Sequence, residues 1–106
     1  MTQLDKEIIN RFKKLLNERV KDFRMILFGS RARGNASHQS DMDIAIVVNE
    51  VIDDTVKDYI SDCAWNAGFE HGIVVVPVVF SQQEWETEQE LHSLLSMAIN
   101  KEGVIV

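Results

Sequence analysis

Cysteine, proline and long apolar runs are almost missing from this sequence. It has one cysteine among 106 residues, so Cys63 has no partner for an internal disulfide or a thiolate metal site, and we expect it in the core. No apolar run approaches the roughly 20 residues that a membrane-spanning helix needs. The first ten residues contain acids and no continuous apolar segment, which argues against a secretory signal. Together these absences favour a cytoplasmic protein that does not enter a membrane.

The length sets a second limit. With 106 residues, the chain can form one domain around one hydrophobic core, but not a catalytic domain together with a separate substrate-binding domain. Apolar residues make up 45% and charged residues 26% of the sequence, which is usual for a globular protein. We therefore expect a single domain over residues 1–106, with one site or with a site that a partner completes.

Basic residues are scarce after residue 40. Residues 1–40 carry nine Lys or Arg against four Asp or Glu, whereas residues 41–106 carry two against thirteen, and the net charge is −6. An acidic balance argues against general binding to a nucleic-acid backbone, which needs a basic surface. A small anionic ligand held together with metal ions would suit both parts of the chain.

Hydrophobic spacing predicts an α/β domain built on a small sheet. Helices are expected over residues 3–20, from Asp53 or Asp54 to a stop at Gly68, from Ser81 onward with Trp85, and over 90–101, where Leu91, Leu94, Leu95, Ala98 and Ile99 would face the core. Strands are expected over residues 25–28, 44–48 and 73–80, with a short one over 104–106. Pro77 cannot donate a ladder hydrogen bond, so we expect a bulge or an unpaired edge there.

The pair Gly29-Ser30 ends the first predicted strand. A glycine there lets another group come close to the backbone, and a serine that opens the next helical turn offers a hydroxyl beside unpaired amides. If residues 31–34 form that turn, its amides point at an anion, and Arg31 or Arg33 could add charge-assisted contacts. The pattern indicates an anion site, although Gly-Ser at a strand end is also common in turns.

Asp41 and Asp43 open the second predicted strand. In an extended segment, the two-residue period puts both carboxylates on one face and Met42 on the other. Two carboxylates so close repel each other unless a cation lies between them. Mg²⁺ suits the arrangement because it binds one or two carboxylates and fills its other positions with water and phosphate oxygens. Alone, such a pair can simply end a turn, but its place ten residues after Gly29-Ser30 favours a metal site.

The joint pattern of Gly29-Ser30, ten residues and Asp41-Met42-Asp43 resembles the signature of the nucleotidyltransferase superfamily related to DNA polymerase β. More narrowly, the segments GSRARG and SDMDI, the apolar strand with proline and the closing KEGVIV resemble the minimal nucleotidyltransferases, which are small single-domain bacterial and archaeal proteins. The resemblance runs over nearly the whole chain. It implies the polymerase β-like nucleotidyltransferase fold, an α/β (α+β) fold in which helices flank a small mixed sheet.

The resemblance also implies a reaction. A nucleoside triphosphate such as ATP would lie with its β and γ phosphates on Gly29-Ser30 and the following turn, and Mg²⁺ would bridge phosphate oxygens to Asp41 and Asp43. An acceptor hydroxyl then attacks the α phosphorus, and pyrophosphate leaves. Such chemistry consists mostly of positioning and charge neutralisation, so carboxylates, metal ions and amides suffice.

One expected residue of that family is missing. Catalytic members carry a third carboxylate on a later strand, but residues 73–80 contain no acid, and the position where we would look for it, Val74 or a neighbour, is apolar. Glu70, just before the strand, is the nearest substitute. A solvent-facing turn residue is an equally good interpretation of Glu70, so nucleotide binding is better supported by the sequence than catalysis.

Minimal nucleotidyltransferases are commonly paired with a small helical protein of the HEPN family, often a ribonuclease toxin. The resemblance therefore implies a type VII antitoxin that transfers AMP, or another NMP, to a tyrosine of such a toxin. Either a homo-oligomer or a hetero-oligomer is compatible with this role. The alternative is a binding module that neutralises the toxin by complex formation with reduced or lost catalysis, and the missing acid favours it. A DNA-binding antitoxin is not expected, because no basic recognition helix is evident.

The remaining histidines and tryptophans give weaker signals. His38 lies in the loop before Asp41, where it could contact phosphate or simply be solvated. His71 and His92 lack the spacing of metal ligands. Trp65 and Trp85 are interpreted as core or interface anchors rather than as base-stacking platforms, because neither lies in a basic patch with further aromatics.

Overall fold

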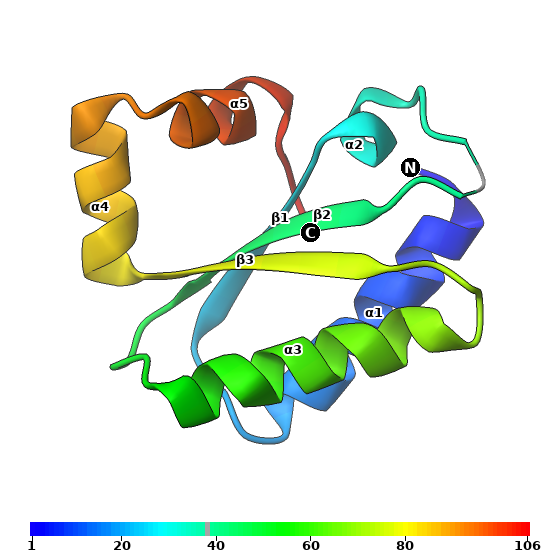
Figure 1. The fold of residues 1–106 in the computed structure, drawn as a ribbon, viewed down its shortest axis with the longest axis horizontal. Helices are drawn as coiled ribbons and strands as arrows, with labels where there is room; N and C mark the ends of the chain where they lie inside the picture. Colours follow the sequence, from blue (N-terminus) through cyan, green and yellow to red (C-terminus); the bar gives the residue numbers. More distant parts are fainter. Residues whose placement is uncertain (38) are drawn as a thin grey trace.

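The computed structural model describes residues 1–37 and 39–106, and within them it contains five helices and one four-stranded sheet (Figure 1). In chain order the elements are α1 (Gln3–Asn17), β1 (Phe23–Phe28), α2 (Ser30–Arg33), β2 (Met42–Val48), α3 (Asp54–Phe69), β3 (Val75–Ser81), α4 (Gln82–Leu91), α5 (Leu94–Glu102) and β4 (Val104–Ile105).

The sheet is mixed, as the sequence predicted. Its strand order is β3-β2-β1-β4, with β1 antiparallel to both β2 and β4 and with β2 parallel to β3. Two parallel neighbours need a long crossover, which here is α3. The antiparallel strands β1 and β2 are instead joined by α2 and the loop after it. This connection therefore starts and finishes at the same end of the two central strands.

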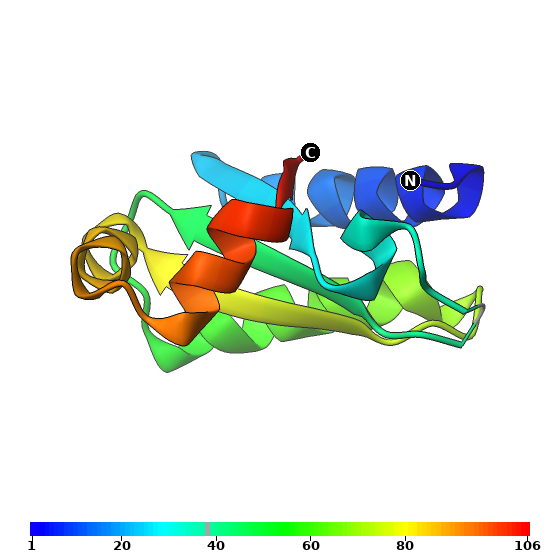
Figure 2. The same ribbon diagram turned by 90° about the horizontal axis from the view of Figure 1, so that it is seen from above.

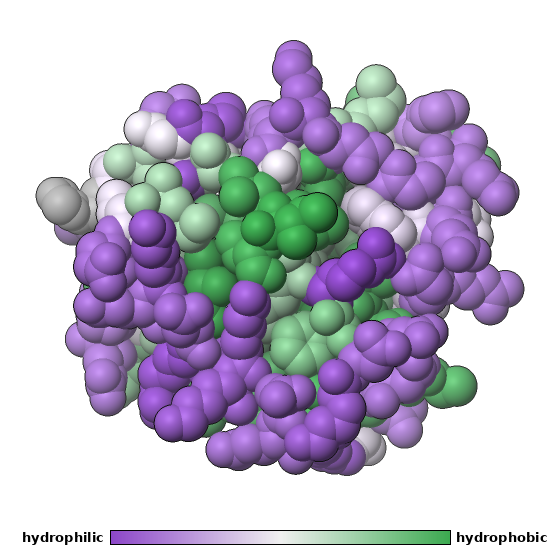
Figure 3. Space-filling view, turned by 180° about the vertical axis from the view of Figure 1, so that it is seen from behind, coloured by the Kyte–Doolittle hydropathy of each residue, from purple (hydrophilic) through white to green (hydrophobic). Residues whose placement is uncertain are grey.

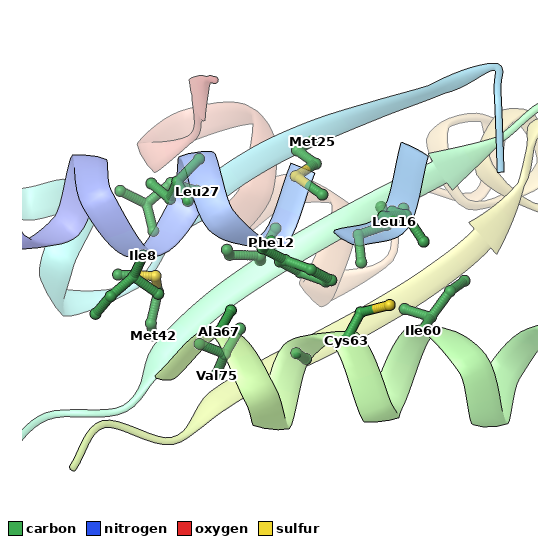
Figure 4. Close-up of a cluster of buried hydrophobic side chains, with 14 of the residues drawn as sticks. Ile8, Phe12, Leu16, Met25, Leu27, Met42, Ile60, Cys63, Ala67 and Val75 are labelled. Carbon is green, nitrogen blue, oxygen red and sulfur yellow. The ribbon is translucent and has the colours of Figure 1, made fainter. Parts of the chain in front are cut away.

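The main core fills the space between the sheet and the helices α1 and α3, which lie on the same face (Figures 1 and 4). Alternate side chains of β2 point into it, as the two-residue period of a strand requires. Cys63 is among its buried residues, as expected. The core side chains labelled in Figure 4 are Ile8, Phe12, Leu16, Met25, Leu27, Met42, Ile60, Cys63, Ala67 and Val75.

A smaller cluster lies on the other face of the sheet, toward α4 and α5. It joins Ala45 and Val47 of β2 to Phe80, Trp85 and Ile99. The rings of Phe80 and Trp85 lie 5.2 Å apart, centroid to centroid. The odd-numbered residues of β2 therefore face this smaller layer, and the alternation continues backward to Asp43 and Asp41.

Pro77 lies on the edge strand β3, so the expectation of an unpaired edge is confirmed and that of a bulge is wrong. The register of β2 with β3 runs without interruption from Met42↔Val75 to Val48↔Ser81. The amide of Met42 donates to the carbonyl of Val74 at 2.9 Å. The backbone polar groups of the even-numbered residues therefore point toward β2, and the backbone nitrogen of Pro77 points to the open edge of the sheet. A missing donor costs nothing there.

Three expectations about helix ends and faces are wrong. Gly68 does not stop α3, which ends at Phe69; instead, a Cβ on Gly68 would overlap the Ile73 carbonyl oxygen, so glycine allows α3 to approach the chain before β3. The expected helix over 90–101 is divided, since α4 runs to Leu91 and Ser93 caps a separate α5. That corner turns three leucines predicted in the core outward, and the exposed leucines are Leu91, Leu94 and Leu95.

The outer surface is mostly polar, with local apolar areas. Viewed from above, α5 lies in front of the sheet, whereas α1 and α3 lie behind it (Figure 2). The face opposite to that of Figure 1 shows a central apolar area bordered by polar side chains (Figure 3). Val104 and Ile105 of the edge strand β4 are exposed. Within residues 1–37 and 39–106, no helix has the length and apolar character to cross a bilayer.

Candidate functional site

The junction between β1 and α2 is formed by Gly29 and Ser30. Gly29 has a φ of 77°, a conformation that side chains disfavour, and its carbonyl accepts the amides of Ala32 and Arg33. These bonds start the single turn of α2. Among the described residues, neither the amide nor the hydroxyl of Ser30 has a hydrogen-bond partner. Two donors are therefore available at this strand end.

Asp43 lies directly against this junction. It pairs with Phe28 in the β1–β2 register, and a Cβ on Gly29 would lie 2.5 Å from Asp43 Oδ2. Glycine is thus required for two reasons, its positive φ and the carboxylate beside it. The fold brings the two halves of the sequence motif into contact, because the antiparallel pairing of β1 with β2 places Gly29 and Asp43 at the same end of these two strands.

The carboxylates of Asp41 and Asp43 interact electrostatically. Burial raises the pKa of the Asp43 carboxyl, the charge of Asp41 raises it further, and Arg33 opposes both by lowering it. Met42 between them is fully buried on the opposite face, so the predicted same-face arrangement holds. A divalent cation between the two carboxylates would relieve their repulsion, and the oxygen donors fit Mg²⁺.

Arg33 is the basic residue of this face. Its guanidinium forms an ion pair with Glu102, with Nη1 and Oε1 3.0 Å apart. The other carboxylate oxygen of Glu102 accepts the amide of Gly29 at 3.2 Å. Sequence reasoning did not single out Glu102, because 73 residues separate it from Gly29 and no local pattern connects them.

Arg31, predicted as a phosphate contact, is turned into the fold. Its side chain is 5% exposed and its Nη1 lies 2.7 Å from Oδ1 of Asp5 on α1. Its Nε and Nη2 donate to the carbonyl of Ser40 at 3.0 and 2.7 Å. The guanidinium therefore joins α1, α2 and the residue before Asp41. This placement gives Arg31 a positioning role, since it holds the two ends of the loop together.

The strand beside the carboxylates carries no acid. Val76 is the register partner of Asp43, so it has the position from which an acid on β3 would face Asp43, and Val74 precedes it on the same face. Glu70 lies at the C-terminal cap of α3, the helix that covers the opposite face of the sheet. Within the described residues no three His, Cys, Asp or Glu side chains are grouped to hold a metal, so this geometry gives Glu70 no support as a third carboxylate.

The other candidates lie away from this arrangement. Trp65 is 59% exposed and stacks obliquely on Phe69 of the same helix, so it is not a core anchor, whereas Trp85 is buried as expected. His71 and His92 are exposed. His38 lies outside the described residues.

The sequence profile of the nucleotidyltransferase domain matches residues 9–106. The chain belongs to this nucleotidyltransferase family. Two relatives from Methanocaldococcus jannaschii, named as inferred protein adenylyltransferases MJ0141 and MJ0604, are each 36% identical to it over 78 residues. These alignments cover 72% and 74% of this nucleotidyltransferase chain and 79% and 71% of the relatives.

A solved structure shares the fold. It is a crystal structure of a toxin-antitoxin with AMP-PNP, and it superposes with a TM-score of 0.64 at 21% identity, over 91% of this chain and 69% of the other. The expected nucleotidyltransferase fold is thereby confirmed. The elements that place Gly29 beside Asp43 belong to the part of the chain that the family profile covers.

Proposed function

We propose that this nucleotidyltransferase binds ATP with Mg²⁺ and transfers AMP to a hydroxyl group of a partner protein. The observation that carries the proposal is the contact between the Gly29-Ser30 junction and Asp43. It places amide and hydroxyl donors next to a pair of carboxylates. A nucleoside triphosphate bound with a divalent cation needs both groups within a few ångströms of each other.

Each residue has a defined task in this reaction. Gly29, Ser30 and Arg33 bind the β and γ phosphates, and Asp41 and Asp43 hold Mg²⁺. When held there, Mg²⁺ would neutralise part of the phosphate charge during the transfer. The acceptor oxygen forms a new bond to the α phosphorus, pyrophosphate leaves, and the hydroxyl proton passes to water. Arg31 acts indirectly by fixing the carbonyl of Ser40, the residue before Asp41.

A protein acceptor is supported by the relatives. Both Methanocaldococcus proteins carry names that describe protein adenylyltransferases, and the structural neighbour was solved as a toxin-antitoxin with an ATP analogue. We propose a tyrosine of a HEPN-type toxin as the acceptor, with this chain as the antitoxin. A second candidate function is neutralisation of the same toxin by complex formation alone, and the apolar residues at Val74 and Val76 favour it.

Intact-mass spectrometry separates these two functions. The purified protein is incubated with ATP, Mg²⁺ and the product of the adjacent gene, tested as the partner, and the partner is then weighed. We expect the partner to gain the mass of AMP. An unchanged mass together with loss of toxin activity would contradict AMP transfer and favour binding alone.

Restoring an acid on β3 is expected to raise the transfer rate by at least about tenfold, as a further carboxylate that assists the acceptor would do. The change is Val76→Asp, since this residue is the register partner of Asp43. The matched control is Val76→Asn, which has a similar shape and no charge. Initial rates are measured by mass spectrometry, and equal rates in both variants would show that the missing acid does not limit the reaction.

A further inference from the structure

The last residue of α5 reaches the proposed phosphate site from the other end of the chain. Both carboxylate oxygens of Glu102 are engaged there. Oε2 accepts the amide of Gly29 at 3.2 Å, and Oε1 pairs with Nη1 of Arg33 at 3.0 Å. The side chain of Glu102 therefore binds the amide of Gly29 and the guanidinium of Arg33, the two groups that the proposed function assigns to phosphate.

The backbone around Glu102 holds it in this place. A Cβ on the next residue, Gly103, would overlap the Ile99 carbonyl oxygen and would lie 2.6 Å from Cγ2 of Ile26 on β1. The chain then continues into β4, which pairs with β1 through Ile26↔Ile105 and Leu27↔Val104. The side chain of Glu102 is 23% exposed, against 45% for Arg33. The contact is thus set by packing on β1 rather than by a freely moving surface side chain.

A carboxylate and a phosphate compete for the same donors. Both accept hydrogen bonds from backbone amides and bind guanidinium groups in the same manner. Arg33 also lowers the pKa of Asp43, so its positive charge interacts with two carboxylates, those of Asp43 and Glu102. A triphosphate that carries its own cation brings more negative charge to Gly29 and Arg33 than one carboxylate does, and both anions cannot occupy these donors together.

We propose that Glu102 is an internal competitor for the phosphate position, and that a bound nucleoside triphosphate displaces it from Gly29 and Arg33. The inference rests on the proposed function, because it concerns the same site. Glu102 then sets the affinity for the triphosphate. Since only Gly103 separates Glu102 from β4, its displacement connects the nucleotide site to the C-terminal strand.

Calorimetric titration with ATP and Mg²⁺ tests the competition. Glu102→Ala is expected to bind ATP with a Kd roughly fivefold lower than the wild type, the effect of removing one partly exposed ion pair. Glu102→Gln keeps the shape and the acceptor for Gly29 and should lie between the two, and it serves the test if the alanine variant is unfolded. Glu90→Ala removes the same charge from an exposed residue of α4 and should leave Kd unchanged.

A second measurement uses the unaltered protein. Two-dimensional amide NMR should show the resonances of both Gly29 and Gly103 shifting when ATP and Mg²⁺ are added. An unshifted Gly103, or an equal or weaker affinity in Glu102→Ala and Glu102→Gln while the wild type binds, would overturn the competition alone. If neither the wild type nor any variant binds ATP, the proposed function fails together with it.

Discussion

Asp43→Asn is expected to lower the rate of AMP transfer by at least about a thousandfold, because metal-assisted charge neutralisation supplies several kcal/mol of transition-state stabilisation. Asparagine keeps the size of the side chain beside Gly29 but removes the charge that holds the cation. Transfer is measured by the mass of the partner protein. Added Mg²⁺ should also raise the melting temperature of the wild type in the presence of ATP, but not that of this variant.

The same substitution should stabilise the protein when no metal or nucleotide is present. Burial and Asp41 raise the pKa of Asp43 in the fold, so the folded state binds this proton more tightly than the unfolded state does. The ionised carboxylate therefore destabilises the fold at neutral pH, and this cost disappears as the pH falls through the raised pKa. Asparagine removes the cost at every pH.

The control for both effects is Asp58→Asn, which makes the same change at an exposed position of α3. It should alter neither transfer nor the response to Mg²⁺. If Asp43→Asn transfers AMP as fast as this control, Asp43 does not hold a catalytic metal. A lower melting temperature in metal-free Asp43→Asn would contradict the electrostatic explanation alone.

Asp5→Ala is expected to reduce the free energy of unfolding by about 3–5 kcal/mol, the usual cost of removing one member of a buried ion pair. Asp5 and Arg31 are both almost completely buried and lie 2.7 Å apart. A small domain is stable by only about 5–15 kcal/mol, so the loss is a large fraction of the total. Urea unfolding measures it.

A capping variant separates the ion pair from the helix cap. Asp5 also accepts the amide of Thr2, whose hydroxyl accepts the amide of Asp5, and these bonds form the capping box of α1. Thr2→Ala removes only the capping side chain and should cost about 1 kcal/mol. If Asp5→Ala costs no more than Thr2→Ala, the pair with Arg31 contributes nothing to stability.

The two halves of the site could be predicted because each depends on local chain geometry. Gly29-Ser30 ends a strand and Asp41-Met42-Asp43 alternates along the next one, and a strand period of two requires no knowledge of the fold. The capping box at Ser81 is local in the same sense, since its two members are three positions apart.

The errors came from contacts between distant segments. Arg31 and Arg33 have the same side chain and lie two positions apart in the sequence. Arg31 nevertheless pairs with a buried carboxylate of α1, whereas Arg33 pairs with a partly exposed carboxylate of α5. Leu91 at the end of α4 and the leucines at 94 and 95 are exposed because the chain turns at Ser93. Their periodicity alone gave no sign of that corner.

The sequence by itself determined the class of fold, the family, and the two local pieces that form the proposed nucleotide site, because hydrophobic period and turn chemistry act over a few residues. Tertiary structure alone decided that Arg31 is a buried clamp, that Val76 faces Asp43 where an acid is missing, and that Glu102 occupies Gly29 and Arg33. Those facts depend on strand register and on helix packing across up to 73 residues, and neither leaves a periodic pattern in the chain. At the proposed nucleotide site, the amide of Gly29 is therefore already bonded to a carboxylate from the other end of the chain.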